Sequence, residues 1–165
     1  YVDATSPMVA DPLRQYDMCP VSDGAAAVLL VAKDKQEELG FGDKKFVKIA
    51  GVGSATDTHV VANREVPTDL LAVRLSAQMA YKMAGVGPED IDVTEIHGEM
   101  PINTSGGLKA KGHPLGATGV SQIVELVKQL RGEAGERQVP GAKTALAINF
   151  GGFGNNVAAT ILTTK

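Results

Sequence analysis

The pattern of apolar and polar residues predicts two strands and a short helix in the first third of the chain. Residues 24–32, GAAAVLLVA, form an apolar run that is too short for a helix core and rich in small and β-branched side chains. Such a run is typical of a strand buried on both faces. Residues 33–39 predict a short polar helix closed by Gly40, and residues 45–54 alternate like a second strand. We expect the first strand to be central in its sheet.

The clearest helical pattern follows Pro67. Thr68 is a candidate N-cap, and Gly85 is the expected end of the helix. Apolar residues recur between them at helical spacing, at Leu70, Leu71, Val73, Ala77, Ala80 and Met83. After a turn at residues 88–90, residues 91–96 predict a strand that ends at His97.

The last third of the chain predicts one more helix and two strands. Residues 116–130 place apolar side chains on one helical face, and Arg131 and Gly132 close the helix. Residues 144–149 and 156–163 read as strands joined by the turn GGFG. This order of elements predicts an α/β fold, a layered α-β-α sandwich, and we expect a mixed five-stranded sheet.

Length and composition favour one domain over residues 1–165 and a small-molecule or protein partner. The chain has 165 residues, 44% of them hydrophobic, and a net charge of -3, which offers no positive field for nucleic acid or an anionic membrane. We find no apolar run of about 20 residues and no export signal. Because Cys19 is the only cysteine, we expect no disulfide framework, no cysteine-rich zinc site and a cytoplasmic location.

The glycine-rich segment at residues 103–119, NTSGGLKAKGHPLGATG, precedes the last predicted helix. Its lysines do not have the spacing of a nucleotide-binding phosphate loop. His113 lies between Gly112 and Pro114, which restricts its backbone and can aim its ring at a fixed point for proton transfer. Taken alone, His113 is better explained as an ordinary hydrogen-bonded turn histidine.

Three segments together resemble the C-terminal half of thiolases. They are SDGAAAVLL at 22–30, VTEIH at 93–97 with the glycine-rich segment 103–119, and NFGGFGNN at 149–156. The sequence is most similar to the archaeal and sterol-carrier-protein-type branch, in which a histidine replaces the asparagine that other thiolases have at the position of His97. The resemblance runs through nearly the whole chain.

The resemblance implies an acyltransferase that uses coenzyme A thioesters as substrates and needs no further cofactor or metal. Thiolases catalyse Claisen condensation or thiolytic cleavage of 3-ketoacyl-CoA through an acyl-cysteine. His113 would activate that cysteine, and His97 would bind the thioester oxygen. The N–H of Gly151 would belong to a second oxyanion site, although a glycine turn between strands is also ordinary. The nucleophile would come from an N-terminal half that this sequence does not contain.

The expected substrate-lining residues are Cys19, Gly106 and Asn149. Cys19 precedes Pro20 where the family usually has a small residue beside the pantetheine tunnel, so we expect it to line the substrate site and not to be the nucleophile. Asn149 stands where many thiolases have a cysteine that shuttles the α-proton, and asparagine cannot act as a base. Glu99 is a weaker local candidate for that task.

The segment between His97 and the NTSGG run is shorter than in thiolases. Either a deletion or a segment absent from the printed sequence after residue 97 explains the difference. The acyl-chain preference stays open, with a short 3-ketoacyl-CoA as the generic expectation.

The resemblance also implies partners. An N-terminal half, as a second chain or another part of the same polypeptide, is required, and a homo-oligomer and a zinc-containing OB-fold partner protein are expected. Two alternatives remain: a condensing enzyme of the ketoacyl synthase kind, and a non-catalytic subunit that binds lipid or coenzyme A.

Overall fold

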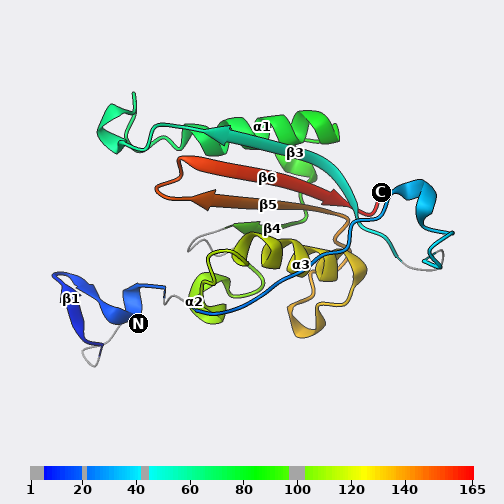
Figure 1. Cartoon of the computed structure of the whole chain (residues 1–165), viewed down its shortest axis with the longest axis horizontal. Helices are drawn as coiled ribbons and strands as arrows, with labels where there is room; N and C mark the ends of the chain where they lie inside the picture. The colour runs from blue at the N-terminus through cyan, green and yellow to red at the C-terminus, as the bar shows by residue number, and fades with distance from the viewer. Residues whose placement is uncertain (1–5, 20–21, 42–44, 97–102) are drawn as a thin grey trace.

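A four-stranded mixed sheet forms the centre of the computed structural model, which describes residues 6–19, 22–41, 45–96 and 103–165 (Figure 1). The strand order is β3-β6-β5-β4. β4 and β5 run parallel, whereas β6 is antiparallel to both β5 and β3. The strands are β3 (Lys48–Thr56), β4 (Val93–Ile96), β5 (Thr144–Gly151) and β6 (Asn156–Thr163).

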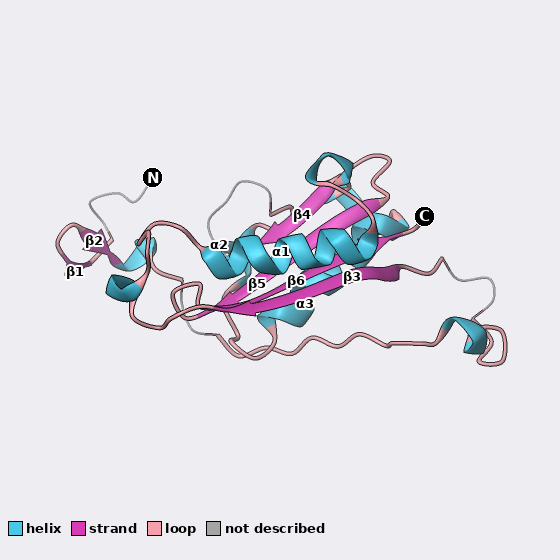
Figure 2. Cartoon of the chain, turned by 90° about the horizontal axis from the view of Figure 1, so that it is seen from above, coloured by secondary structure: helices cyan, strands magenta, loops and turns pink. Residues whose placement is uncertain are grey.

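Two long helices cover opposite faces of this sheet, which confirms the layered α/β sandwich (Figures 1 and 2). Helix α1 (Leu71–Ala84) packs on β3 and β6, and helix α3 (Thr118–Arg131) packs on β4 and β5. A Cβ at Gly51 or Gly53 of β3 would collide with backbone carbonyl oxygens of α1. Glycine therefore allows the helix to lie directly on the strand.

Both long helices end at the predicted glycines. Gly85 follows α1 and Gly132 follows α3, and each adopts a left-handed conformation with positive φ. The prediction that Thr68 caps α1 was wrong, because Leu70 occupies the N-cap position without a side-chain cap. Asp69, just before the helix, instead pairs with Arg74 on the helix surface.

Several short elements lie outside the sandwich. Strands β1 (Met8–Ala10) and β2 (Leu13–Arg14) form a small antiparallel pair, and helix α2 (Gly107–Lys111) precedes the GHP segment. The remaining 3₁₀ turns are η1 (Gln15–Asp17), η2 (Lys33–Lys35), η3 (Val61–Asn63), η4 (Pro88–Asp90) and η5 (Gly135–Arg137). The sequence pattern predicted neither the small strand pair nor α2, because both are too short to show a period.

The prediction of a central buried strand at residues 24–32 was wrong. These residues are described, but they run as an extended segment without strand pairing. Leu29 is 77% exposed and Leu30 is 71% exposed. The sheet of the described residues consequently has four strands and not five, because β3 occupies its edge with no further strand beside it.

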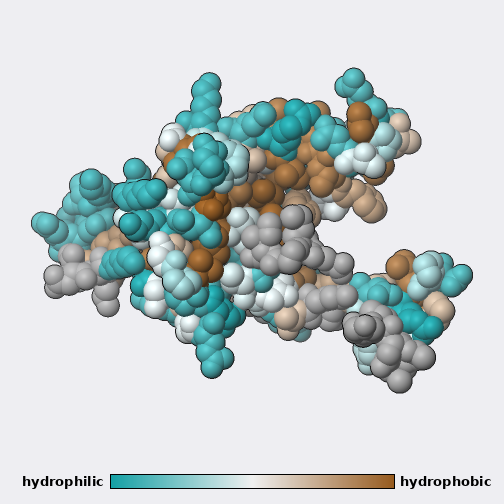
Figure 3. Space-filling view, turned by 180° about the vertical axis from the view of Figure 1, so that it is seen from behind, coloured by the Kyte–Doolittle hydropathy of each residue, from teal (hydrophilic) through white to brown (hydrophobic). Residues whose placement is uncertain are grey.

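Large apolar side chains remain exposed on this chain, and Figure 3 shows apolar atoms gathered in the middle of the face opposite that of Figure 1. Contiguous exposed apolar surface is typical of a region that another protein part covers. Within the described residues, no helix has the length and apolar character that crossing a membrane requires.

Candidate functional site

The GHP segment connects α2 to α3 and fixes the ring of His113. Nδ1 of His113 lies 2.8 Å from the hydroxyl oxygen of Thr118, in the first turn of α3. That hydroxyl donates to the carbonyl oxygen of Pro114 at 3.1 Å. A hydroxyl has one hydrogen, so with its hydrogen on Pro114 the bond to His113 requires Nδ1–H as the donor. The lone pair of the neutral ring then lies on Nε2, the arrangement that a general base needs.

The extended segment at residues 22–26 packs against the GHP segment. A Cβ on Gly24 would lie 2.8 Å from Cγ of Pro114, and one on Gly112 would collide with the side chain of Ser22. Gly112 also has φ +77, which L side chains rarely adopt. The two segments line a groove of about 450 Å³, formed by Ser22, Asp23, Gly24, Ala25, Ala26, Pro114, Leu115, Gly116 and Ala117. Two of the three sequence segments that resemble thiolases therefore meet at this groove.

Asn149 brings the third thiolase-like segment, residues 149–156, close to the start of α3 and so to the GHP segment. A Cβ on Gly119 would lie 2.8 Å from Nδ2 of Asn149, so the first turn of α3 approaches the end of β5 closely. Gln122 reinforces this contact, since its buried Nε2 donates to the carbonyl oxygens of Glu95 and Ile148 at 3.3 and 3.1 Å. The structure thus brings the helix that anchors His113 against β5 near Asn149.

Gly151 ends β5 at an exposed position, and the turn to β6 follows it. A Cβ there would meet only Cβ of Asn156, at 4.0 Å, so packing alone does not require glycine. Gly152 and Gly154 differ, because their φ angles of +59 and +74 do require it. The predicted oxyanion role of Gly151 stays a prediction.

Cys19 and Gly106 both lie at α2. Sγ of Cys19 is 3.4 Å from the carbonyl oxygen of Leu108 within that helix. Gly106 is the N-cap of α2, with φ +89, and a Cβ there would lie 2.7 Å from Cβ of Ala110. Their predicted role in lining the substrate site stays a prediction. His97, Glu99 and the expected break after residue 97 lie outside the described residues.

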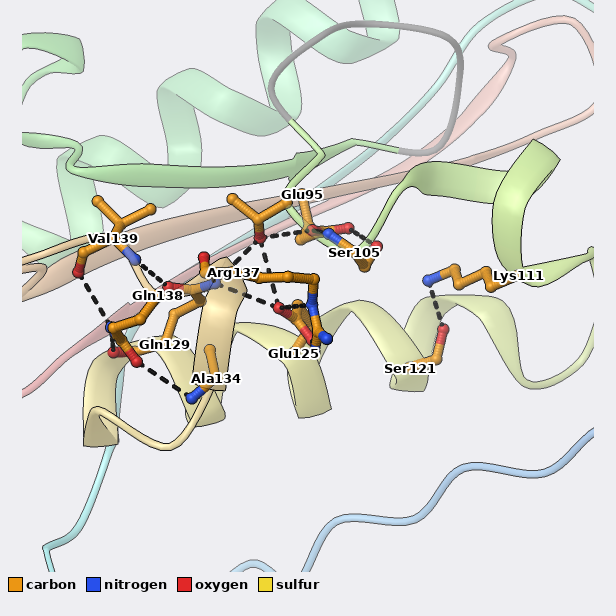
Figure 4. Close-up of polar contacts among 11 residues, drawn as sticks. Glu95, Ser105, Lys111, Ser121, Glu125, Gln129, Ala134, Arg137, Gln138 and Val139 are labelled. Atoms are coloured by element: carbon orange, nitrogen blue, oxygen red, sulfur yellow. Dashed lines mark hydrogen bonds and ion pairs between the residues drawn. The ribbon is translucent and has the colours of Figure 1, made fainter.

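A buried carboxylate that the sequence pattern did not single out anchors the glycine-rich segment. Glu95 of β4 is 1% exposed. Its two oxygens accept from the N–H and the hydroxyl of Ser105 at 2.9 and 2.8 Å, and Oε1 also accepts from Thr104 at 3.2 Å (Figure 4). An acidic residue inside an apolar strand pattern was the available signal. The network fixes the chain that leads into α2 and on to His113.

Glu125 of α3 lies next to this network (Figure 4). Burial acts to raise the pKa of Glu125, but hydrogen bonds from Arg137 and Gln129 and the charge of Arg137 outweigh it, so the pKa is lowered. Arg137 donates through Nη2 at 3.0 Å and Nε at 3.3 Å. The carboxylate therefore stays ionised and binds the η5 turn to α3.

Within the parts of the chain that the structure describes, no group of three or more histidine, cysteine, aspartate or glutamate side chains is arranged to hold a metal ion.

Comparison with a family model adds evidence on ancestry. The model described as "Thiolase C-terminal domain-like" matches residues 53–97 and 93–164. The acetyl-CoA acetyltransferase of Methanothermobacter thermautotrophicus is 40% identical over 190 aligned positions, which cover 94% of this chain and 49% of that protein. Sterol carrier protein 2 of Rattus norvegicus is 36% identical over 180 positions, with 87% and 33% covered. The chain therefore spans half or less of the length of these relatives.

Solved structures share the fold at lower identity. A monomeric SCP2-thiolase like protein type 1 from Mycobacterium smegmatis superposes with a TM-score of 0.72 at 19% identity, covering all of this chain and 39% of that one. Human mitochondrial 3-ketoacyl-CoA thiolase superposes with a TM-score of 0.61 at 21% identity, covering 81% of this chain and 34% of that one. At these identities the likeness concerns the fold alone.

Proposed function

The chain belongs to the thiolase family as its C-terminal half, and from this premise we propose that it contributes His113 to acyl transfer between coenzyme A thioesters. The reaction is Claisen condensation of two acyl-CoA molecules, or the reverse thiolytic cleavage of a 3-ketoacyl-CoA. A cysteine from the N-terminal half forms the acyl-enzyme. A short 3-ketoacyl-CoA is the substrate class that we propose.

The hydrogen bond between His113 and Thr118 is the observation on which this proposal depends most. It orients the ring and leaves Nε2 on the side of the ring away from Thr118; we propose that this nitrogen acts on the cysteine of the N-terminal half. An imidazole in this state can accept the proton of a cysteine thiol, which becomes a nucleophilic thiolate. The N–H of Gly151 would then stabilise the oxyanion of the tetrahedral intermediate, and His97 would bind the thioester oxygen.

The groove of residues 22–26 and 114–117 supports a substrate path beside His113. We propose that the pantetheine arm passes this region, with Cys19, Gly106 and Asn149 among the residues that line the wider site. The same proposal includes the N-terminal half, which would also cover the exposed apolar segment at Leu29 and Leu30. A homo-oligomer, a zinc-containing OB-fold partner and a cytoplasmic location belong to the proposal on the strength of resemblance alone.

A single-turnover acylation experiment on the complete protein tests the proposal. Mixing with acetyl-CoA should produce an acyl-enzyme that intact mass spectrometry detects, and His113→Ala should abolish it while leaving the thermal unfolding midpoint near that of the wild type. Near-normal acylation of His113→Ala would contradict the assigned role.

A non-catalytic lipid- or CoA-binding role is the second candidate, because two observations favour it. Asn149 replaces the proton-shuttling cysteine of many thiolases, and relatives include proteins named sterol carrier protein 2 and non-specific lipid-transfer protein-like 2, the latter from Caenorhabditis elegans. This candidate predicts that the wild-type protein binds an acyl-CoA in calorimetry yet forms no acyl-enzyme and releases no free coenzyme A.

A further inference from the structure

Residues 57–70, which follow β3, contact the glycine turn at residues 152–155 between β5 and β6. Nη2 of Arg64 donates to the carbonyl oxygen of Phe153 at 2.8 Å. The N–H of Asp57 donates to the carbonyl oxygen of Asn155 at 2.7 Å. Leu70 packs at the end of the turn, where a Cβ on Gly154 would lie 3.0 Å from it. One segment therefore contacts three consecutive residues of the turn, 153–155.

Asn155 ties the turn to itself and to His59. Its Oδ1 accepts from the N–H of Phe153 at 3.1 Å. This bond identifies the oxygen of the side-chain amide, so the other terminal atom is the nitrogen. Nδ2 is then 2.9 Å from Nδ1 of His59 and donates to it. Asn155 is 1% exposed although Phe153, at the tip of the turn, is 75% exposed. Both polar groups of Phe153's backbone are thus bonded to buried side chains.

The side chain of Arg64 is only 4% exposed, and its ion pair with Asp57 is long. Oδ2 of Asp57 lies 3.7 Å from its Nε, and that Nε has no hydrogen-bond partner among the described residues. Burying such a charge costs free energy. A turn that only links two antiparallel strands needs no buried arginine.

Two glycines with positive φ make this turn flexible unless other residues fix it. Hydrogen-bond donors stabilise an oxyanion effectively only when they are already in position before the reaction. Reorienting them during the reaction would cost free energy that offsets the stabilisation from the hydrogen bond. Gly151 pairs with Asn156 at the end of the β5–β6 ladder, two residues before Phe153. The ladder fixes one side of Gly152 and Arg64 fixes the other, so Arg64 limits how far the backbone that leaves Gly151 can turn.

We propose that Arg64 is a positioning residue for acyl transfer, supported by Asn155 and His59, and that it acts by fixing the turn that presents the N–H of Gly151. The inference rests on the proposed function. It assigns a task in catalysis to residues 57–70, which are distant in sequence from both GHP and GGFG.

Variants of the complete protein test this inference. Arg64→Met removes the donor, Arg64→Lys keeps the charge and one donor, and Arg74→Met is the matched control, because Arg74 is exposed and pairs with Asp69 on the surface of α1. The measurements are kcat and KM for acyl-CoA turnover, the thermal midpoint, and the infrared stretch of a ¹³C-labelled acyl-enzyme carbonyl, which reports hydrogen bonding to the oxyanion site.

We expect Arg64→Met to lower kcat about 10- to 100-fold with little change in KM, and to shift the carbonyl stretch toward that of a free thioester. Arg64→Lys should recover part of both effects, and Arg74→Met should resemble the wild type. His59→Ala, at an exposed position, should lower kcat by about 2- to 5-fold without affecting folding, so it provides the test if Arg64→Met does not fold.

The outcomes separate the two proposals. An active wild type together with unchanged kcat and carbonyl stretch in Arg64→Met, or in His59→Ala where Arg64→Met does not fold, overturns the positioning role alone. A loss of activity that the thermal midpoint fully explains overturns it as well. A wild type that forms no acyl-enzyme overturns the proposed function, and the positioning role with it.

Discussion

The hydroxyl of Thr118 determines what His113 can do. It is the hydrogen-bond partner of Nδ1 and belongs to the first turn of α3, so the helix start and the imidazole form one unit. Thr118 is 1% exposed, which keeps water from competing for this bond. In the proposed reaction the imidazolium that forms after proton transfer would keep the same partner, because Nδ1–H donates in both protonation states.

Thr118→Val removes this bond while preserving the shape of the side chain. In the complete protein we expect the acylation rate to fall by about 10- to 100-fold, because the ring loses its fixed orientation and tautomer. Thr144→Val is the matched control, since the hydroxyl of Thr144 is buried without a hydrogen-bond partner among the described residues. Single-turnover acylation measures the difference, and equal rates in the two variants would exclude a role for the hydroxyl.

At the residue scale the sequence indicated His113 but not its partners. The segment GHPLGATG contains both His113 and Thr118, yet their contact depends on where α3 begins. The predicted start at residue 116 was two residues early. Glu95 was missed for a similar reason: it occupies a strand position where alternation alone does not say whether the side chain meets water or a hydrogen-bonding turn.

At the scale of elements, Glu95 connects β4 to the turn before α2. It accepts three hydrogen bonds from Thr104 and Ser105, so it stabilises a segment without regular structure of its own. A buried acceptor cannot be replaced by water here, since Glu95 is 1% exposed. The position of α2, and of His113 after it, therefore depends on a carboxylate in the neighbouring strand.

Glu95→Ala leaves the hydroxyl and the backbone N–H of Ser105 without their acceptor, and leaves the hydroxyl of Thr104 with only Glu125 as a carboxylate acceptor, at 3.4 Å. We expect a loss of about 2–4 kcal/mol in the free energy of unfolding, measured by urea titration. Glu133→Ala, which changes an exposed glutamate after α3, should change it by less than about 0.5 kcal/mol. A Glu95→Ala protein as stable as the Glu133→Ala control would show that the network is not formed.

Glu125 should make stability depend on pH. Its pKa is lowered in the folded protein, so the unfolded chain binds more protons around the ordinary glutamate value. The contribution is present above the ordinary glutamate pKa of about 4.5, which applies to the unfolded chain, and it disappears as the pH falls through the lower pKa of the folded protein. Urea unfolding between pH 7 and pH 3 should therefore show a smaller loss of stability in Glu125→Gln than in the wild type. Parallel curves for the two proteins would contradict the lowered pKa.

Element prediction succeeded where the pattern was long and bounded by glycine. The helices that end at Gly85 and Gly132 and the final strand pair were all predicted near their positions, because apolar periodicity and a left-handed cap coincide. Strand order was not predictable in the same way. The pairing of β3 with β6, which are far apart in sequence, depends on tertiary packing.

For the whole molecule, residues 24–32 carry the apolar pattern of a buried strand but lie extended and exposed. Local sequence determined the extended conformation, whereas burial requires partner strands that the described residues do not provide. The thiolase C-terminal family model also begins its match only at residue 53. These observations agree with the proposal that the N-terminal half covers this segment.

A lysine at position 29 tests that proposal in the complete protein. Leu29 is 77% exposed in this chain, so Leu29→Lys would leave stability unchanged if the segment stayed exposed. Burial under the N-terminal half would instead force a charge into an apolar contact and lower the free energy of unfolding by about 2 kcal/mol or more. Leu39→Lys, at a leucine that is 55% exposed beyond η2, is the matched control and should have almost no effect. Equal unfolding free energies for the two variants would place residues 24–32 on the surface of the assembled protein.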